Sequence, residues 1–375
     1  MIDLGFTEQQ KLMQHTIREF LAKECPRELV RDIEDNKRDY SPEMYRKMAD
    51  LGWLGLLIPE QYGGIGGDWV DGALFYEEAG RALLPGPHWS SAVLGSQAVL
   101  TFGNERQRGE LLPKIAEGEI IITVALAEPE FRCDITKLST TAKAQGGSYL
   151  VNGTKIFVTS GHLADRLIVV ARMEGGEEKA VSLFLVEPDA PGVAVTPMQT
   201  LGGERLSEVV LDNVRVPGDS VLGSIGDGEG IEEVVDKANL MLAAEMLGGA
   251  QVALNLAVEY SKQRIAFDKP IGAFQALQHK MANMLVEIEC ARGIIYYAAW
   301  LTSQGRPAAA ERAMAQFQAG EAYGFATREA TQIFGGVGVM KDADITLHFR
   351  RAKMRQLSLA PPEVLRERML APLAI

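Results

Sequence analysis

The middle of the chain, residues 121–225, differs in hydrophobic pattern from both flanking segments, and this difference most constrains the fold. Short runs rich in β-branched residues lie at 120–124, 149–151, 156–159, 167–170 and 181–186. Turn residues separate these runs, and Asn152-Gly153 between two apolar runs is a strong hairpin signal. Short strands at this spacing predict a small antiparallel barrel or sandwich.

Helical periodicity dominates on both sides of this segment. Before residue 121, apolar residues recur at helical spacing, and Thr7 and Ser41-Pro42 are typical helix starts. After residue 230, the segments 232–262, 272–303 and 307–334 are apolar on most faces, as buried bundle helices are. We therefore expect an α+β, multi-segment chain. Its domains are a helical N-terminal domain over 1–120, a central β domain over 121–225 and a C-terminal four-helix bundle over 226–375.

Composition and charge argue against several classes of function. The formal net charge is -12, from 38 Lys+Arg against 50 Asp+Glu, which disfavours nucleic-acid binding. The longest apolar stretch, 238–258, is interrupted by polar residues and predicts a buried helix, with no membrane span. The three cysteines, Cys25, Cys133 and Cys290, lie far apart without metal-ligand spacing. With no secretory signal pattern at the start, we expect a cytoplasmic protein without a metal site.

Several strings along the chain carry a resemblance to a known family. They are Arg264-Ile-Ala-Phe267-Asp-Lys-Pro270 with Gln275, Gln332-Ile-Phe-Gly335-Gly336-Val-Gly338, Ala127-Glu128-Pro129 with Asp134, Asn152-Gly153-Thr154-Lys155, and Val214 with Val216-Pro217. In this order and spacing they resemble the acyl-CoA dehydrogenase family over essentially the whole chain. The resemblance implies an oxidoreductase of acyl-CoA metabolism with FAD as cofactor. It also implies an acyl-CoA substrate, assembly into a homotetramer or heterotetramer, and reoxidation by an electron-transferring flavoprotein.

The resemblance assigns one part of the FAD site to the β segment. Phe157 and Thr159 match an aromatic-x-Thr string that packs on the flavin ring. The family usually has Trp there, so Phe157 keeps the aromatic face and loses the indole donor. Leu126 and Ala127 match a strand end facing the flavin, although Leu126 is equally consistent with a core position. Cys133 stands where the family has a hydroxyl donor, and a thiol is a poorer one.

The other part of the FAD site falls in the helical C-terminal segment. By resemblance, Arg264 pairs with the FAD pyrophosphate of the neighbouring subunit, and guanidinium suits such a bidentate contact. Phe267 and Gln275 match positions lining the adenine half. The turn with Gln332, Gly335 and Gly336 matches one that contacts the adjacent protomer's FAD. Taken alone, these residues also fit a solvated arginine at a helix end, a core phenylalanine and a glycine helix cap.

The chain departs from the family at the catalytic base. The family reaction needs a carboxylate within hydrogen-bond reach of the substrate α-carbon. The usual position falls on Leu359, within the stretch 356–362, and the position used by a second branch of the family falls on Ala238. Neither side chain can accept a proton.

Glu245 is the nearest candidate for a replacement base. It lies seven residues beyond Ala238, on nearly the same helical face but about 10.5 Å further along the axis. If unpaired in this apolar run, its pKa should be raised, as is common for general bases. The alternative is a carboxylate paired with an arginine, which is commoner for buried acids, and the axial offset argues against direct substitution. Glu363, the other nearby carboxylate, follows Pro361-Pro362 and reads as a first helical turn.

Three functional hypotheses follow from these observations. The sequence leads us to favour an active FAD-dependent acyl-CoA dehydrogenase that uses Glu245 or another carboxylate. The second hypothesis is a catalytically silent subunit that pairs with an active homologue and completes its FAD site through Arg264 and the glycine turn. The third is a flavin oxidase or monooxygenase on the same scaffold, which no residue pattern selects.

Overall fold

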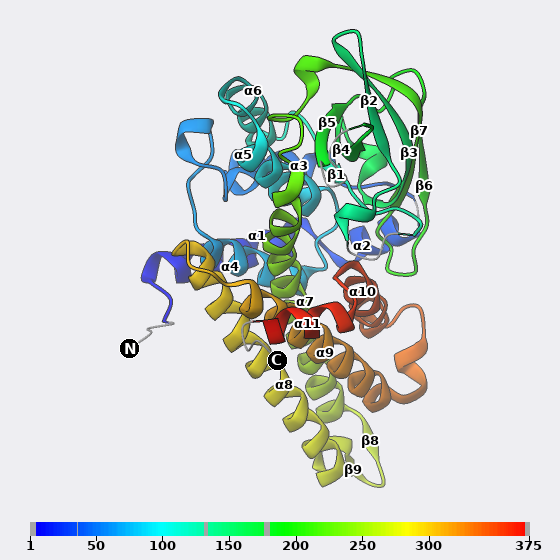
Figure 1. The fold of residues 1–375 in the computed structure, drawn as a ribbon. Coiled ribbons are helices and arrows are strands. Elements are labelled where there is room, and N and C mark those ends of the chain that lie inside the picture. Colours follow the sequence, from blue (N-terminus) through cyan, green and yellow to red (C-terminus); the bar gives the residue numbers. More distant parts are fainter. Residues whose placement is uncertain (1–4, 36, 131–133, 176–180, 372–375) are drawn as a thin grey trace.

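The structure, a computed structural model of the 375-residue chain, describes residues 5–35, 37–130, 134–175 and 181–371. Helices open and close the chain, and a curled sheet lies between them (Figure 1). This order confirms the predicted fold class.

The N-terminal helices surround a shared apolar core. They are α1 (Glu8–Glu24), α2 (Arg27–Glu34), α3 (Pro42–Asp50), α4 (Trp69–Ala82), the π-helix η3 (His88–Gly95), α5 (Ser96–Phe102) and α6 (Glu105–Ala116). Side-chain caps set several starts: Thr7 and Gln10 form a capping box at α1, and Ser41 caps α3, where Pro42 is the first helical residue.

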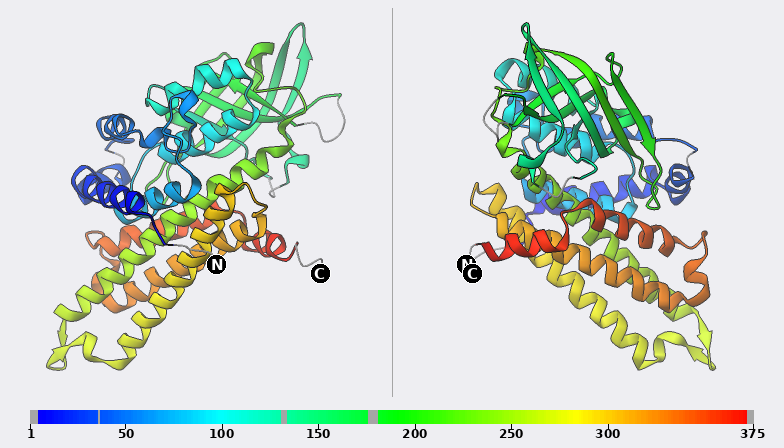
Figure 2. Two further views of the ribbon diagram at one scale, coloured as in Figure 1. Left: turned by 90° about the vertical axis from the view of Figure 1, so that its left-hand side faces the viewer. Right: turned by 45° about the vertical axis from the view of Figure 1, so that its right-hand side comes forward.

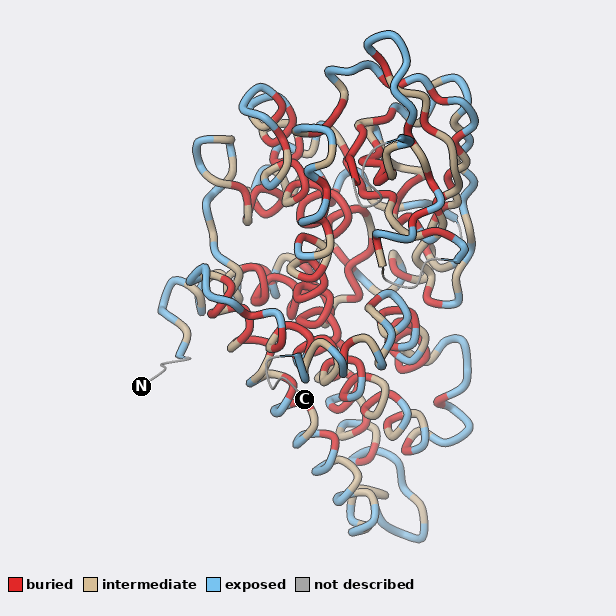
Figure 3. The backbone as a smooth tube through the Cα atoms, in the orientation of Figure 1, coloured by how far each residue is buried: buried red, intermediate tan, exposed pale blue. Residues whose placement is uncertain are grey.

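The C-terminal helices continue this core without interruption. They are α7 (Ile231–Gln263), α8 (Gln275–Ser303), α9 (Ala309–Phe334), α10 (Asp344–Ser358) and α11 (Pro362–Leu370), with the short strands β8 (Ile265–Ala266) and β9 (Lys269–Pro270) between α7 and α8. One cluster of buried apolar residues spans the N-terminal helices and this bundle. Figure 3 shows that burial is concentrated where α4 and α7 meet and declines toward the far end of the bundle.

Glycines allow α4 and α7 to cross closely. A Cβ on Gly80 would lie 1.8 Å from the carbonyl oxygen of Glu245, and one on Gly248 would lie 1.8 Å from that of Glu77. The segment 228–263 is long and apolar enough to span a membrane, but 72% of its most apolar window is buried inside the protein. This burial is that of a core helix of a bundle.

The central sheet has its own core between its curled faces. Its strands are β1 (Ile122–Ala125), β2 (Thr141–Gln145), β3 (Ser148–Thr159), β4 (Arg166–Met173), β5 (Val181–Val186), β6 (Val193–Met198) and β7 (Leu206–Pro217). The order is β1-β4-β2-β3-β7-β6, with β5 beside β4. β4 pairs in parallel with β1 and β2, whereas the other pairs are antiparallel, so the sheet is mixed where the sequence predicted antiparallel pairing throughout.

The hairpin predicted at Asn152-Gly153 was wrong. β3 runs straight through these residues with a register shift, and the turn lies earlier, at Gly146-Gly147, both with positive φ. Gly153 serves a different purpose, because a Cβ there would lie 2.4 Å from Oγ1 of Thr140. The glycine therefore allows a close approach within a bulged strand and does not form a turn.

Candidate functional site

Both positions at which the resemblance places the family's base lie inside packed structure. Leu359 follows α10 and is buried among apolar residues of the helical core. Ala238 lies on α7 with no exposed surface, and its carbonyl oxygen accepts a hydrogen bond of 2.9 Å from the indole Nε1 of Trp89. Neither position presents a polar side chain.

Glu245 is buried and paired with two arginines of α10. Its Oε1 accepts hydrogen bonds from Nε of Arg355 at 2.9 Å and from a terminal nitrogen of Arg351 at 3.2 Å, and the residue is only 2% exposed. Burial alone would raise its pKa, but the two guanidinium groups outweigh it and hold the pKa of Glu245 below its ordinary value. The raised pKa expected for an unpaired Glu245 is absent, because the residue has the arginine pairing that sequence reasoning named as the alternative.

The ion pairs continue from the bundle into the β domain. Arg355 also donates to Glu204, 2.5 Å away, in the connection between β6 and β7. Arg350 pairs with Glu34 of α2 in the same region. The network thus joins α7, α10, α2 and the β6–β7 connection. Sequence reasoning missed the arginines, whose only local signal is that Arg351 and Arg355 are four residues apart on one helix face.

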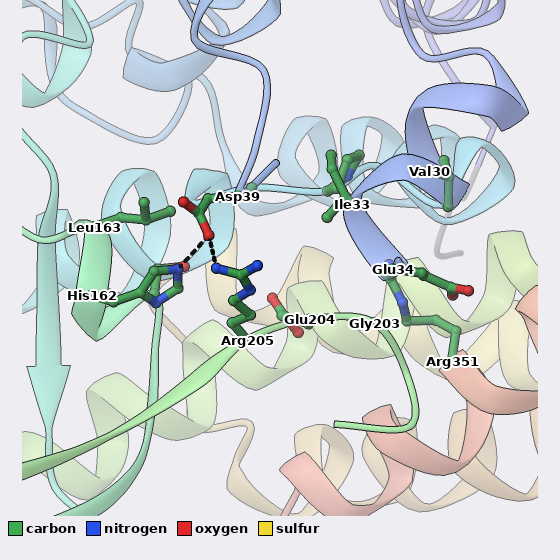
Figure 4. Close-up of a pocket in the computed structure, with 13 residues that line it drawn as sticks. Val30, Ile33, Glu34, Asp39, His162, Leu163, Gly203, Glu204, Arg205 and Arg351 are labelled. Carbon is green, nitrogen blue, oxygen red and sulfur yellow. Dashed lines mark hydrogen bonds and ion pairs between the residues drawn. The ribbon is translucent and has the colours of Figure 1, made fainter. Parts of the chain in front are cut away.

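A small cavity lined by apolar and charged residues adjoins this network (Figure 4). Asp39 lies at its rim, where its carboxylate pairs with Arg205 and lies 3.6 Å from Nε2 of His162. Glu204 and Arg351 contribute to the lining. The cavity measures about 20 Å³. This is room for a water molecule and not for an acyl chain.

A buried ion pair fixes the end of β1, where Leu126 and Ala127 lie. The ammonium of Lys155 donates to the carbonyl oxygen of Leu126 at 3.1 Å and to Glu128 at 2.7 Å. The carboxylate of Glu128 also accepts the backbone N–H groups of residues 139 and 140. The carbonyl oxygen of Ala127 accepts the N–H of Ile156. These bonds hold the strand end rigidly against β3.

Phe157 and Thr159 lie on the neighbouring strand. Phe157 sits within a register shift of β3 with φ 55°, and this bulge turns its ring outward, leaving the residue 56% exposed. Thr159 is half-buried, and its carbonyl oxygen accepts a hydrogen bond from Thr123 of β1. The structure thus brings Leu126 and Ala127, which follow β1, close to Phe157 and Thr159 of β3. Cys133 lies outside the described residues.

The remaining predicted FAD residues gather at the free end of the bundle, here called the bundle tip. It comprises Arg264, Phe267, Gln275, Gln332, Gly335 and Gly336. The end of α9 lies against α7 and α8 here, because the rings of Tyr260 and Phe334 stack with centroids 4.3 Å apart and Lys280 pairs with Glu329. In Figures 1 and 2 the strands β8 and β9 mark this end, far from the sheet.

All six residues of the bundle tip are exposed. Phe267 is 87% exposed, which rules out the core role that its sequence context allowed. Arg264 is exposed, and its side chain has no hydrogen bond or ion pair within the described part of the chain. A Cβ added to Gly335 or Gly336 would meet no atom within 4 Å. An exposed ring, an available guanidinium and open backbone fit the flat and anionic parts of FAD.

A single chain does not bring the two parts of the predicted site together. Phe157 and Thr159 belong to the β domain, whereas the bundle tip lies at the opposite end of the molecule (Figure 2). A ligand contacting both groups must therefore bridge two chains. This separation agrees with the contact across a subunit boundary that the resemblance implies for Arg264.

Comparison with known proteins agrees with this architecture. Three acyl-CoA dehydrogenase family models match the chain: the N-terminal domain over 7–119, the middle domain over 123–214 and the C-terminal domain over 229–373. An acyl-CoA dehydrogenase of Bacillus subtilis is 35% identical over 370 residues, covering 96% of each chain.

Solved structures match over the full length. Butyryl-CoA dehydrogenase from Megasphaera elsdenii superposes with a TM-score of 0.91 at 30% identity and full coverage of both chains, 100% and 100%. The ChsE4-ChsE5 complex from Mycobacterium tuberculosis gives 0.90 at 27% identity, covering 100% of this chain and 99% of that one. The chain therefore belongs to the acyl-CoA dehydrogenase family of FAD-binding oxidoreductases.

Proposed function

We propose that this chain is a FAD-binding subunit of a hetero-oligomeric acyl-CoA dehydrogenase whose catalytic carboxylate comes from a homologous partner. The assembly would oxidise an acyl-CoA thioester between its α- and β-carbons. The observation that carries this proposal is the pairing of Glu245 with Arg351 and Arg355. It replaces the hypothesis favoured from sequence, in which this chain is itself active and uses Glu245 or another carboxylate as the base.

A general base needs an accessible oxygen and a suitable pKa. Oε1 of Glu245 is engaged by two guanidinium groups, and Oε2 has less than 1 Å² of accessible surface. The lowered pKa makes the carboxylate a still weaker proton acceptor. Glu363 lies in the first turn of α11, where the positive end of the helix dipole stabilises the charged carboxylate. With Leu359 and Ala238 inert, no carboxylate described at these positions is suited to the reaction.

The bundle tip supports a role toward a partner. FAD, when bound, supplies the hydride acceptor for the oxidation. Arg264 would hold the pyrophosphate through paired hydrogen bonds, and the exposed ring of Phe267 would lie against the adenine half. Gln275, Gln332 and the backbone at Gly335 and Gly336 would complete this contact, while Phe157, Thr159, Leu126 and Ala127 would contact a flavin held by the β domain.

The comparisons supply further support for an assembly of two kinds of chain. One of the matching solved structures is described as a complex of ChsE4 with ChsE5. The proposal also places the assembly in the reducing cytoplasm, in agreement with the free thiols of Cys25 and Cys290. It further includes reoxidation of the reduced FAD by an electron-transferring flavoprotein.

A self-sufficient acyl-CoA dehydrogenase is the second candidate. Its support is the 35% identity, over nearly the whole chain, to a protein named acyl-CoA dehydrogenase. This candidate requires a base other than Glu245 and Glu363. It predicts that the chain alone turns over acyl-CoA.

The partner role is tested by producing the chain with a homologue that carries the family's glutamate. We expect the co-purified assembly to contain FAD and to lose flavin on gel filtration when Arg264→Gln is present in this chain alone. Lys262→Gln, one residue from the end of α7, is the matched control because its side chain pairs with Glu259. Equal flavin content in the Arg264→Gln and wild-type assemblies would overturn the partner role.

A further inference from the structure

The connection between α9 and α10, residues 335–343, carries the glycines of the bundle tip but has little apolar anchorage of its own. Val337, Val339 and Met340 are all exposed. Gly338 is buried, and a Cβ added to it would lie 2.6 Å from the carbonyl oxygen of Thr331 near the end of α9. This contact lies in the middle of the connection, and two turns, closed by the N–H groups of Met340 and Ala343, lead from it to α10.

Arg31 of α2 contacts the end of the connection from the N-terminal helices. One terminal nitrogen donates to the carbonyl oxygen of Lys341 at 2.7 Å. The other donates to the carbonyl oxygen of Asp342 at 2.8 Å and to the carboxylate of Asp344 at 2.7 Å. One guanidinium therefore donates hydrogen bonds to two successive backbone carbonyls and to the side chain of the first residue of α10.

Two neighbouring ion pairs reinforce this contact. The ammonium of Lys341 donates to Asp35 at 2.6 Å, just beyond α2. Nε of Arg27 lies 3.8 Å from the second oxygen of Asp344. Ala343, the residue preceding α10, offers no side-chain cap. Residues of α2 and Asp35 thus contact the end of the connection and the first residue of α10.

We propose that Arg31 is a positioning residue for FAD binding, which acts by holding the connection 335–343 in its binding geometry. This inference rests on the proposed function, since it takes Gly335 and Gly336 as FAD contacts. A connection already ordered in the free protein loses less conformational entropy when ligand binds, so the bound state forms more readily. Arg31 itself lies outside the bundle tip and would touch no part of the cofactor.

A purely structural role for Arg31 makes a different prediction. If its bonds only fasten α2 to α10, its loss should lower stability and leave FAD affinity unchanged. A positioning role predicts weaker FAD binding in protein that remains folded. It also predicts faster amide exchange confined to residues 335–343.

The test compares Arg31→Gln with Arg38→Gln, a control only a few residues further along the chain. Arg38 is exposed, and a terminal nitrogen of its side chain lies 3.9 Å from the carboxylate of Asp32. FAD is titrated into each flavin-stripped, co-purified assembly, and hydrogen–deuterium exchange is followed without FAD. We expect Arg31→Gln to weaken FAD binding about tenfold and to deprotect 335–343, with Arg38→Gln unchanged. Arg31→Lys should recover only part of the affinity, because an ammonium cannot reproduce the fork geometry.

The outcomes separate this inference from the proposed function. Wild-type affinity in folded Arg31→Gln protein would overturn the positioning role and leave the proposed function standing. Failure of the wild-type assembly to bind FAD would overturn the proposed function and this inference with it. If Arg31→Gln does not fold, Arg31→Lys takes its place, because the ammonium keeps the charge and loses the fork geometry. A folded Arg31→Lys assembly with unchanged FAD affinity and unchanged exchange would then overturn the inference.

Discussion

The carboxylate of Glu245 and the guanidinium of Arg355 meet in the interior of the protein, with Oε1 and Nε 2.9 Å apart and both residues almost without exposed surface. The two residues come from α7 and α10 and are 110 positions apart in the sequence. The same guanidinium reaches Glu204 in the β domain, so one side chain links three parts of the chain. This linkage gives Glu245 a structural role in the contact between the helical and β domains.

Replacing Glu245 with glutamine should strongly destabilise the protein. Arg351 and Arg355 would remain buried with less negative charge to balance them, and breaking a buried ion pair in this way costs about 3–5 kcal/mol. Chemical denaturation measures the free energy of unfolding. The control is Glu259→Gln on the same helix, where the exposed pair with Lys262 should contribute at most about 0.5 kcal/mol. Equal effects in the two variants would contradict the structural role.

Stability should fall in acid because of the same carboxylate. The folded-state pKa of Glu245 lies below its ordinary value of 4.5, so the folded state binds this proton less readily than the unfolded state. Its contribution is therefore fully present above about pH 4.5 and is lost as pH falls through the lower, folded-state pKa. Unfolding free energies of wild type and Glu245→Gln, measured from pH 7 downward, should converge over this range. If the difference in unfolding free energy stayed constant with pH, Glu245 would not be the source of the acid destabilisation.

Adding a methyl group where α4 crosses α7 should destabilise the fold. Gly248→Ala places a Cβ 1.8 Å from the carbonyl oxygen of Glu77, so the helices must move apart. We expect a loss of at least about 2 kcal/mol, the upper part of the usual range for overpacking. Gly293→Ala on α8 is the matched control, because no atom lies within 4 Å of its Cβ, and it should gain up to about 1 kcal/mol from helix propensity. Thermal denaturation of both variants tests the difference.

Removing the exposed ring of Phe157 should affect FAD binding more than stability. The residue is half exposed on a bulged strand, so Phe157→Ala removes little core packing. Aromatic contacts contribute about 1 kcal/mol beyond area burial, which corresponds to about fivefold in affinity. Fluorescence titration of flavin-stripped assembly with FAD measures the change. Val158→Ala, at the buried neighbouring position, should do the reverse, lowering the melting temperature with little change in FAD affinity.

Much of the fold follows from hydrophobic periodicity. The long apolar helices predicted at 232–262, 272–303 and 307–334 correspond closely to α7, α8 and α9. Apolar segments of this length are too long for single strands of the sheet, so the pattern indicates buried helices. The hairpin at Asn152-Gly153 failed because a local turn signal cannot reveal that Thr140 packs against Gly153 from another segment. The parallel pairing of β4 with β1 and β2 likewise depends on contacts that no local pattern encodes.

The candidate site shows the same limit. Sequence spacing could place Glu245 on one face of a helix, but it could not show that Arg351 and Arg355 face it from α10. Phe267 is exposed because the connection between α7 and α8 lies away from the core. The sequence does not show where this connection lies, so it allowed both a core and a surface role for Phe267. The motif residues of the bundle tip were found through resemblance because their order and spacing are preserved along the chain.

The most direct test of the account is anaerobic reduction of FAD by acyl-CoA in the purified chain without a partner. The chain is reconstituted with excess FAD, a panel of acyl-CoA thioesters of different chain lengths is added, and flavin absorbance is recorded. We predict no bleaching with the isolated chain and rapid bleaching once the glutamate-bearing homologue is present. Substrate-dependent bleaching by the chain alone would show that it carries its own base and would contradict the proposed role.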